Sequence, residues 1–376
     1  MCLCIPLPGR PSDNDGNAIL QQWSEPMRSA QQSGRHAVGV ALLAVTALAA
    51  AACSSSTSSL SSTSTPATST PTVGTSTSAS ASAAASVTNV SLGYVPYSDD
   101  ASLFYAQDSG IFRQHGLNVS FVAQASPVAV EASMASGTEQ FGFITTPVLI
   151  NLNSKGVSVK CVSSVDGSEP SNPADDSTVL VAAKGSGITS VKGLAGKNVA
   201  EVQLTSLNSL AVEVLAKQAG INPSSIHQIA IPFPQMAAAL AQGRVQAAVD
   251  VAPFASTAMS EGATVLTHPN VDLFPNGTVT CLDAMSSYIS ANPTMVSEFR
   301  AAMNQSIAYS KTHESVVKQT LVSHLELPPA VAQAQILATN WNSTFNVASI
   351  TAIENYMKEF GVITTEPPAS SLVWNP

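Results

Sequence analysis

The stretch YVPYSDDASLFYAQDSGIFRQHGLNVSF, residues 94–121, contains the alternation that decides the fold. A strand-like apolar run ends in a loop with two adjacent carboxylates, Asp99 and Asp100. A helix-like run follows and closes at Gly110, and a second β-branched run begins a few residues later. The order of strand, helix and strand favours parallel pairing with a crossover helix, and hence an α/β architecture.

The same alternation continues along the chain and predicts parallel sheets. We expect strands at 89–95, 118–124, 140–144, 157–165, 178–184, 197–203, 226–233 and 245–251, and again from 278. We expect helices at 101–110, 127–137, 206–220, 235–243 and 253–262, and a mainly helical tail as far as Gly361. One further helix is expected to begin at Thr146 as N-cap, with Pro147 at its first position. The polar segment 166–177 is expected to be a loop.

The first 52 residues predict an export leader. An apolar tract, AVGVALLAVTALAAAA at 37–52, follows Arg28 and Arg35 and ends before Cys53. The tract is short for a transmembrane helix, and its small residues fit a cleaved signal. This ending resembles a bacterial lipoprotein signal, in which the cysteine becomes the lipid-modified first residue. A plain export signal or a retained amphipathic anchor is the alternative, and the leader could start at Met1 or at Met27.

Residues 53–86 predict a disordered tether between the lipidated Cys53 and the folded part. After that cysteine the segment is rich in Ser, Thr and Ala and has no charged residue. Such a composition buries too little apolar surface to offset the ordering of its backbone. Ser/Thr tracts with proline can also carry O-glycans, which the sequence leaves open.

Charge and cysteine content restrict the partners. With 24 acidic and 15 basic residues the formal net charge is −9, which argues against nucleic acid. Of the five cysteines, only Cys161 and Cys281 fall in the folded part. A pair in an exported domain favours a disulfide, because a metal site would need more ligands. We therefore expect neither a metal nor a cofactor.

The run at 94–121 resembles the opening of the nitrate/sulfonate/taurine and thiamine-precursor binding proteins of ABC importers. In that family a strand, a Tyr/Asp loop and a helix precede a G-x-F-x-x-x-G-L-x-V run, which is found here from Gly110 to Val119. Four later segments match the family in the same order: ASGTEQFGFITT (135–146), ITSVKGLAGKNVA (188–200), LAKQAGINPSSI (215–226) and AAALAQGRVQAAVDVAPFA (237–255). The resemblance covers most of residues 90–308.

The resemblance implies a periplasmic-binding-protein fold of type II, with two α/β lobes joined by two hinge crossings. One lobe would comprise residues 87–184 and 280–376, and the other residues 185–279. Both remaining cysteines would then lie on strands of the first lobe, where a bridge between them is reasonable.

In open α/β sheets ligands gather beyond the carboxyl ends of strands, where helix N-termini point their free amides. Each polar residue at such an end has two interpretations, as a cap or turn residue and as a ligand contact. For the acidic pair we expect one of each. The candidate ligand-binding residues are Tyr97, Asp99, Asp100, Thr145, Thr146, Gln203, Thr205, Ser206, Asn208 and Asp250.

None of these segments contains lysine or arginine, the usual partners of a strongly anionic ligand. Acids without bases favour a cationic, zwitterionic or neutral hydrogen-bonding solute. An amino-sulfonate or an aminopyrimidine-like heterocycle fits this pattern.

The function that we expect is a monomeric, lipid-anchored, extracytoplasmic solute-binding protein, without enzymatic activity, that delivers a small organic molecule to ABC permease subunits. The six histidines show no metal-ligand or catalytic spacing. The alternatives are an enzyme on the same fold, such as a sulfinate desulfinase or a pyrimidine synthase, and a non-transport surface protein. The identity and charge of the solute remain open.

Overall fold

The computed structural model describes residues 87–167, 176–274, 277–335, 337 and 340–376. All of them belong to one compact unit, Ser80–Pro376. The predicted leader, the tether and Cys53 lie outside the described residues. Within the described ranges, no helix has both the length and the apolar character needed to cross a bilayer.

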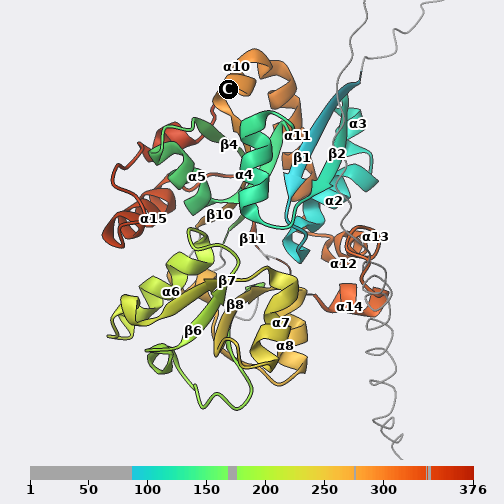
Figure 1. Ribbon diagram of the computed structural model, residues 1–376. Helices are drawn as coiled ribbons and strands as arrows, with labels where there is room; N and C mark the ends of the chain where they lie inside the picture. The colour runs from blue at the N-terminus through green and yellow to red at the C-terminus, as the bar shows by residue number, and fades with distance from the viewer. Residues whose placement is uncertain (1–86, 168–175, 275–276, 336, 338–339) are drawn as a thin grey trace, which may run out of the picture. The chain divides into compact units, whose positions relative to one another are not determined.

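The strands of the described chain form two sheets, of six and five strands (Figure 1). The first sheet has the order β11-β4-β10-β3-β1-β2, with these bounds: β1 (Thr88–Tyr94), β2 (Leu117–Ala123), β3 (Phe141–Thr145), β4 (Val159–Gly167), β10 (Thr278–Met285) and β11 (Asn340–Trp341). The second has the order β7-β6-β8-β5-β9, with these bounds: β5 (Thr178–Ala182), β6 (Asn198–Glu201), β7 (His227–Ala230), β8 (Ala247–Val251) and β9 (Thr264–Thr267).

Both sheets are mixed, which corrects the prediction of parallel sheets. The consecutive βα units pair in parallel, β1 with β2 and β3, and β6 with β7 and β8. In contrast, β10 runs antiparallel to β3 and β4, and β5 runs antiparallel to β8 and β9. Strands β5 and β10 are the first that the chain forms after it passes from one sheet to the other. No crossover helix within the same sheet therefore sets their direction.

The predicted division of the chain differs from the strand pairing at two places. Thr278 and Val279 were expected in the second lobe, but they begin β10 of the first sheet. Residues 178–184 were expected in the first lobe, but Thr178–Ala182 forms β5 of the second sheet. The chain therefore passes from the first sheet to the second between β4 and β5, and it returns between β9 and β10.

Helices cover the sheets as the alternation predicts. Those that follow strands of the first sheet are α2 (Ala101–Asp108), α3 (Ile111–Gln114), α4 (Pro127–Ser136) and α5 (Thr146–Ser154). Those of the middle segment are α6 (Leu207–Gln218), α7 (Phe233–Ala241), α8 (Phe254–Ser260) and α9 (Pro269–Leu273). The tail contains α10 (Ser286–Ala291), α11 (Pro293–Ser310), α12 (Glu314–Lys318), α13 (Thr320–His324), α14 (Pro329–Ala334) and α15 (Val347–Glu359).

The apolar residues of the strands alternate between two faces, as expected for sheets that are covered on both sides. In β8, Ala247 and Val249 pack in one cluster with α6, whereas Ala248 packs in another with Met236 of α7. On β3, Gly142 allows a close approach of α4, because a Cβ there would collide with the Met134 side chain. In the first sheet, α2 and α11 pack together on one face, and α4 and α5 contact β3 and β10 (Figure 1).

The bounds and number of the elements differ from the prediction in several details. Helix α5 begins at Thr146 itself, so Thr145 occupies the N-cap position, one residue earlier than predicted. The short strands β9 and β11 were not predicted.

Cys161 on β4 and Cys281 on β10 form a disulfide with their Cα atoms 5.5 Å apart.

Candidate functional site

The acidic pair after β1 lies in a 3-10 turn, η1 (Ser98–Asp100), directly ahead of α2. The Asp100 carboxylate accepts a hydrogen bond from the Tyr97 N–H through Oδ2 at 3.0 Å. Asp100 is fully buried, and its Oδ1 has no hydrogen-bond partner among the described atoms. One oxygen of Asp100 therefore fixes the turn, while the other is left without a donor.

Asp99 reaches the segment that leads into β5. The Ser177 hydroxyl donates to Asp99 Oδ2 at 2.7 Å. The neighbouring Asp176 accepts hydrogen bonds from the N–H of Thr178 at 2.9 Å and from the N–H of Asn270, at the start of α9, also at 2.9 Å. Asp99 and Asp176 thus meet where the chain crosses between the sheets.

A fourth acid, Asp166, comes from the end of β4. It is opposite Thr280 of β10 in the strand register, and only 2% of its surface is exposed. Its Oδ1 and the Thr280 hydroxyl have no hydrogen-bond partner among the described residues. Asp99 lies close enough for like-charge repulsion to raise the pKa of both Asp166 and Asp176. We call Asp99, Asp100, Asp166 and Asp176 the acidic group.

Burial is the main reason why pKa values in the acidic group are raised. It raises the pKa of Asp100 and of Asp166 well above the usual range, and repulsion from Asp99 adds to both. Burial also raises the pKa of Asp176 to about 7, against the opposing effect of its backbone hydrogen bonds. The pKa of the Tyr97 hydroxyl is raised by burial and then by the charges of the same acids.

No lysine, arginine or histidine of the described chain forms an ion pair with Asp100, Asp166 or Asp176. The ion pairs among the described residues involve other acids. Residues 168–175, which connect β4 to the segment before β5, contain no lysine or arginine in their sequence. Within the described residues, these three carboxylates therefore have no cationic partner.

Tyr97 connects the acidic group to the second sheet. Its ring is 5.9 Å from the ring of Phe143 on β3 and 6.4 Å from that of Phe233 at the start of α7, measured between centroids. The next residue, Ser98, donates its N–H to the carbonyl oxygen of Ala252, just after β8, at 3.0 Å. The loop after β1 therefore contacts elements that follow strands of the second sheet.

The threonines after β3 have different surroundings. Thr146 is fully buried and donates its hydroxyl to the carbonyl oxygen of Thr278 at 2.6 Å, so it holds α5 against β10. The Thr145 hydroxyl is buried without a partner among the described residues. Thr145 is opposite Thr280 in the strand register, which places it one strand away from Asp166.

The candidates after β6 form a second polar group around Gln203. Its Nε2 donates to Thr205 Oγ1 at 3.0 Å and to Oε1 of Glu131, on α4, at 2.9 Å. Ser206 is the N-cap of α6, and its hydroxyl accepts the N–H of Ser209 at 3.3 Å. Asn208, in the first turn, is 8% exposed. The predicted capping role of Ser206 is thus seen, and Gln203 makes the contact with the first sheet.

Asp250 stands apart from both groups. It is fully buried near the end of β8, where Oδ1 accepts the N–H of Val251 at 2.9 Å and Oδ2 has no partner among the described residues. Burial raises its pKa to about 8. The hydrogen bonds of the described residues do not join Asp250 to the acidic group.

Residues 98–315, more than half of the chain, match the family described as NMT1/THI5 like. The chain belongs to the NMT1/THI5-like family. No curated protein sequence matches it.

Three solved structures similar to this NMT1/THI5-like chain are described as binding components or binding proteins. The ligand-binding component of an ABC-type import system from Staphylococcus aureus, with zinc bound, has 16% identity and a TM-score of 0.65, covering 76% of this chain and 96% of its own. The aliphatic sulphonate binding protein SsuA of Escherichia coli has 19% identity and a TM-score of 0.63, covering 77% and 98%. The nitrate-binding protein NrtA of Synechocystis PCC 6803 has 14% identity and a TM-score of 0.65, covering 76% and 85%. At these identities the similarity shows the fold, and the predicted periplasmic-binding-protein fold is confirmed.

Three residues of this NMT1/THI5-like chain are spaced as metal ligands could be. They are Cys161, Cys281 and Asp283, whose potential ligand atoms lie within 4.8 Å of one another. Both sulfurs belong to the disulfide, and all three residues are fully buried. A bridged cysteine supplies neither a thiolate ligand nor a nucleophile. This grouping therefore does not support the desulfinase alternative.

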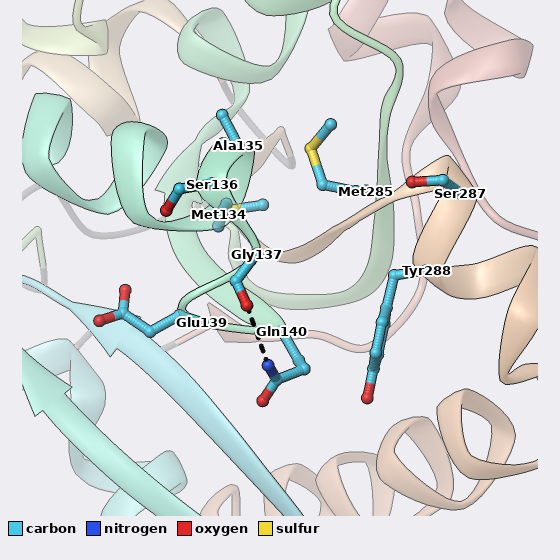
Figure 2. Close-up of a pocket in the computed structure, with 9 residues that line it drawn as sticks. All are labelled: Met134, Ala135, Ser136, Gly137, Glu139, Gln140, Met285, Ser287 and Tyr288. Carbon is cyan, nitrogen blue, oxygen red and sulfur yellow. Dashed lines mark hydrogen bonds between the residues drawn. The ribbon is translucent and has the colours of Figure 1, made fainter. Parts of the chain in front are cut away.

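A cavity of about 340 Å³ lies between the end of α4 and the start of α10 (Figure 2). Met134, Met285 and Tyr288 provide its larger side chains. Gln140 at its edge donates to the Gly137 carbonyl oxygen at 3.3 Å. None of the predicted ligand-binding residues is among those that line it.

The structure of this NMT1/THI5-like chain thus brings together Tyr97, Asp99 and Asp100, and it places the Gln203 segment at a separate contact. Asp166, Asp176 and Glu131 were not identified from the sequence. The two aspartates lie in the segment 166–177, which was interpreted only as a loop, although Asp166 belongs to the end of β4 and Asp176 stands two residues before β5. Glu131 is the one acid in the helical stretch 127–137, and this exception in an otherwise uncharged helix was the available signal.

Proposed function

We propose that this chain is the extracytoplasmic solute-binding component of an ABC importer. Its membership of the NMT1/THI5-like family supports this, as do the similar structures, which are described as sulphonate-binding, nitrate-binding and ABC-import proteins. The solute would be a small organic molecule: a sulfonate, a taurine-like or nitrate-like compound, or a pyrimidine or thiamine precursor. The protein would present it to the permease subunits.

The observation that carries the proposal is the contact between loops that follow strands of the two sheets. The Ser98 N–H bonds to the Ala252 carbonyl oxygen, and the ring of Tyr97 contacts that of Phe233. Polar residues with unsatisfied oxygens surround this contact. In α/β proteins, the carboxyl ends of strands are where ligands bind.

The mechanism we propose is closure of two lobes on the solute. One lobe would carry the first sheet and the helical tail, and the other the second sheet. The segments between β4 and β5 and between β9 and β10 would be the hinges. A solute that contacts both lobes at once binds the closed form more tightly than the open form and so shifts the population toward closure.

We further propose that the chain is exported, anchored by lipid on Cys53 to the outer face of a bacterial membrane, and monomeric. The leader sequence and the composition of residues 53–86 support this. Expression of the full chain and of Cys53→Ser, followed by fractionation, tests it. The wild type should sediment with membranes, and the variant should be released into the soluble exported fraction.

We propose no enzymatic role, since the described histidines lie outside the acidic group and the remaining cysteines are bridged. The decisive experiment is native mass spectrometry of the purified chain, followed by a thermal-shift screen of sulfonates, nitrate, amines and pyrimidines. A true solute raises the unfolding midpoint by mass action. Absence of a stabilising compound in all these classes would contradict the proposal.

A further inference from the structure

We propose that the acidic group is a subsite for the charged nitrogen of an organic cation, a primary ammonium or an amidinium, whose carbon body lies against Tyr97. This inference rests on the proposed solute-binding function and names the class of solute. It departs from the sulphonate and nitrate that the similar structures are described as binding.

The acidic group contains buried oxygens that have no donor among the described residues. Asp100 Oδ1 and Asp166 Oδ1 have no partner among the described residues, and the two side chains are 0% and 2% exposed. Two hydroxyls are also buried without a described partner. One belongs to Ser98, which precedes the acidic pair in the chain, and the other to Thr280, which is opposite Asp166 in the strand register. An ammonium offers three N–H donors and an amidinium four, so either could satisfy several of these acceptors at once.

The charge of the acidic group also favours a cation. Four carboxyl groups converge from three separate segments, close enough for like-charge repulsion to add to the rise in pKa of Asp100, Asp166 and Asp176. An anionic solute would add a further negative charge to this group, whereas a cation would remove the repulsion. Hydrogen bonds between a cation and carboxylates are also stronger than those between neutral groups.

The aromatic surroundings favour an organic cation over a metal ion. Tyr97, whose N–H bonds to Asp100, contacts the rings of Phe143 and Phe233, and the ring of Phe233 stacks on that of Phe254 with 6.1 Å between centroids. Aromatic faces attract organic cations and bury their carbon atoms. Hard metal ions bind through oxygen ligands and gain little from such a wall.

The test uses the full chain and probes matched in size. Benzamidine, benzamide and benzoate are nearly isosteric and differ in charge, and benzylammonium with benzyl alcohol forms a second pair. Calcium chloride and zinc chloride provide the metal arm. Thermal shift and calorimetric titration should show stabilisation by the two cations alone. Binding of the neutral or anionic probes but not of the cations, stabilisation by a metal salt alone, or no effect of any probe would overturn the inference.

Two isosteric variants locate the subsite. Asp100→Asn and Asp166→Asn should each weaken benzamidine binding by at least about tenfold, because each replaces a carboxyl group that a bound cation would favour in its ionised form by an amide that cannot ionise. The matched control is Asp283→Asn, since Asp283 is also fully buried on the first sheet with both oxygens unpartnered among the described atoms, and burial alone raises its pKa. Equal weakening by the control would show a general loss of structure and would contradict the assignment.

The inference and the proposed function fail differently. If a sulfonate, nitrate or neutral pyrimidine stabilises the chain and the cations do not, the solute-binding function stands and the cation subsite is wrong. If no compound of any class binds, the proposed function itself is wrong.

Discussion

Asp100 and Asp283 are both fully buried in the first-sheet half of the fold, and each has oxygens without a described partner. Their surroundings differ. Asp283 is opposite Cys161 of the disulfide in the strand register, and only burial raises its pKa. Asp100 lies among Asp99 and Asp166, which add their repulsion. Burial alone is thus enough to raise the pKa of a carboxyl group. The convergence of acids from separate segments is what distinguishes a candidate binding site from a structural position.

The largest effect should come from the disulfide beside Asp283. Replacing both Cys161 and Cys281 by alanine removes a link between residues 120 positions apart, and we expect the free energy of unfolding to fall by about 2–5 kcal/mol. Urea denaturation measures this loss. If the region of Asp283 is structural, the folded variant should keep the solute affinity of the wild type. A large loss of affinity would blur the distinction between the two aspartates.

The next effect is the pH dependence of stability. A carboxyl with a raised pKa in the folded protein retains its proton where the unfolded chain has lost it. Its stabilising contribution is therefore present below the unfolded pKa, near 4, and is lost as the pH rises through the folded pKa. That value is about 7 for Asp176, which faces Asp99, and about 8 for Asp250. Asp100 and Asp166, which face Asp99 and each other, have raised values as well.

Between about pH 5.5 and 8.5 we expect ionisation of Asp176 alone, at about 1.4 kcal/mol per pH unit up to its pKa of about 7, to lower stability by about 2 kcal/mol, equivalent to roughly 4–8 °C in the unfolding midpoint. Ionisation of Asp250 adds to this fall. Calorimetry without solute measures it. Affinity for an organic cation should change in the opposite direction, rising with pH as the acidic group ionises. A cation affinity that does not depend on pH would contradict the role of the acidic group, whereas Asp283→Asn should alter only the stability profile.

The local order of the fold could be predicted because each unit is bounded by residues with strong conformational preferences. Pro127 begins α4 and Gly137, with φ of 75°, ends it, and both boundaries were recognised from sequence. The directions of β5 and β10 could not be predicted, because they depend on where the chain crosses between sheets. The two residues of β11 are too few to show an alternating pattern.

The site could be predicted only where it is local. The loop after β1 contains Tyr97, Asp99 and Asp100 in one stretch, so the sequence identified them together. Asp166 and Asp176 join them only through the pairing of β4 with β10 and the crossing into β5, which are contacts distant in sequence. Polar residues next to strand ends, even within segments that look like plain loops, deserve the same scrutiny as those before helices.

Asp250 tests the comparison from the other side, because it is buried and isolated like Asp283 but lies near a strand end like Asp100. We expect Asp250→Ala to weaken binding of a cationic solute by at least about tenfold, as for a charge-assisted hydrogen bond. Calorimetric titration measures the change, and Asp250→Asn controls for the loss of volume. Equal affinities of wild type and variants would remove Asp250 from the site and group it with Asp283.

The smallest effect should be at Glu131, which joins α4 to Gln203 of the second sheet through a hydrogen bond of 2.9 Å. This contact connects the sheets without any convergence of acids, and Glu131 is only partly buried. We expect Glu131→Ala to weaken solute binding roughly threefold, the size of one ordinary hydrogen bond, and Glu131→Gln, which keeps an acceptor oxygen, to weaken it less. Titrations of both variants against the wild type measure the difference. If Glu131→Ala weakens binding more than Asp100→Asn does, the main contacts with the solute lie at Gln203. Convergence of carboxylates would then not be the feature that marks the site.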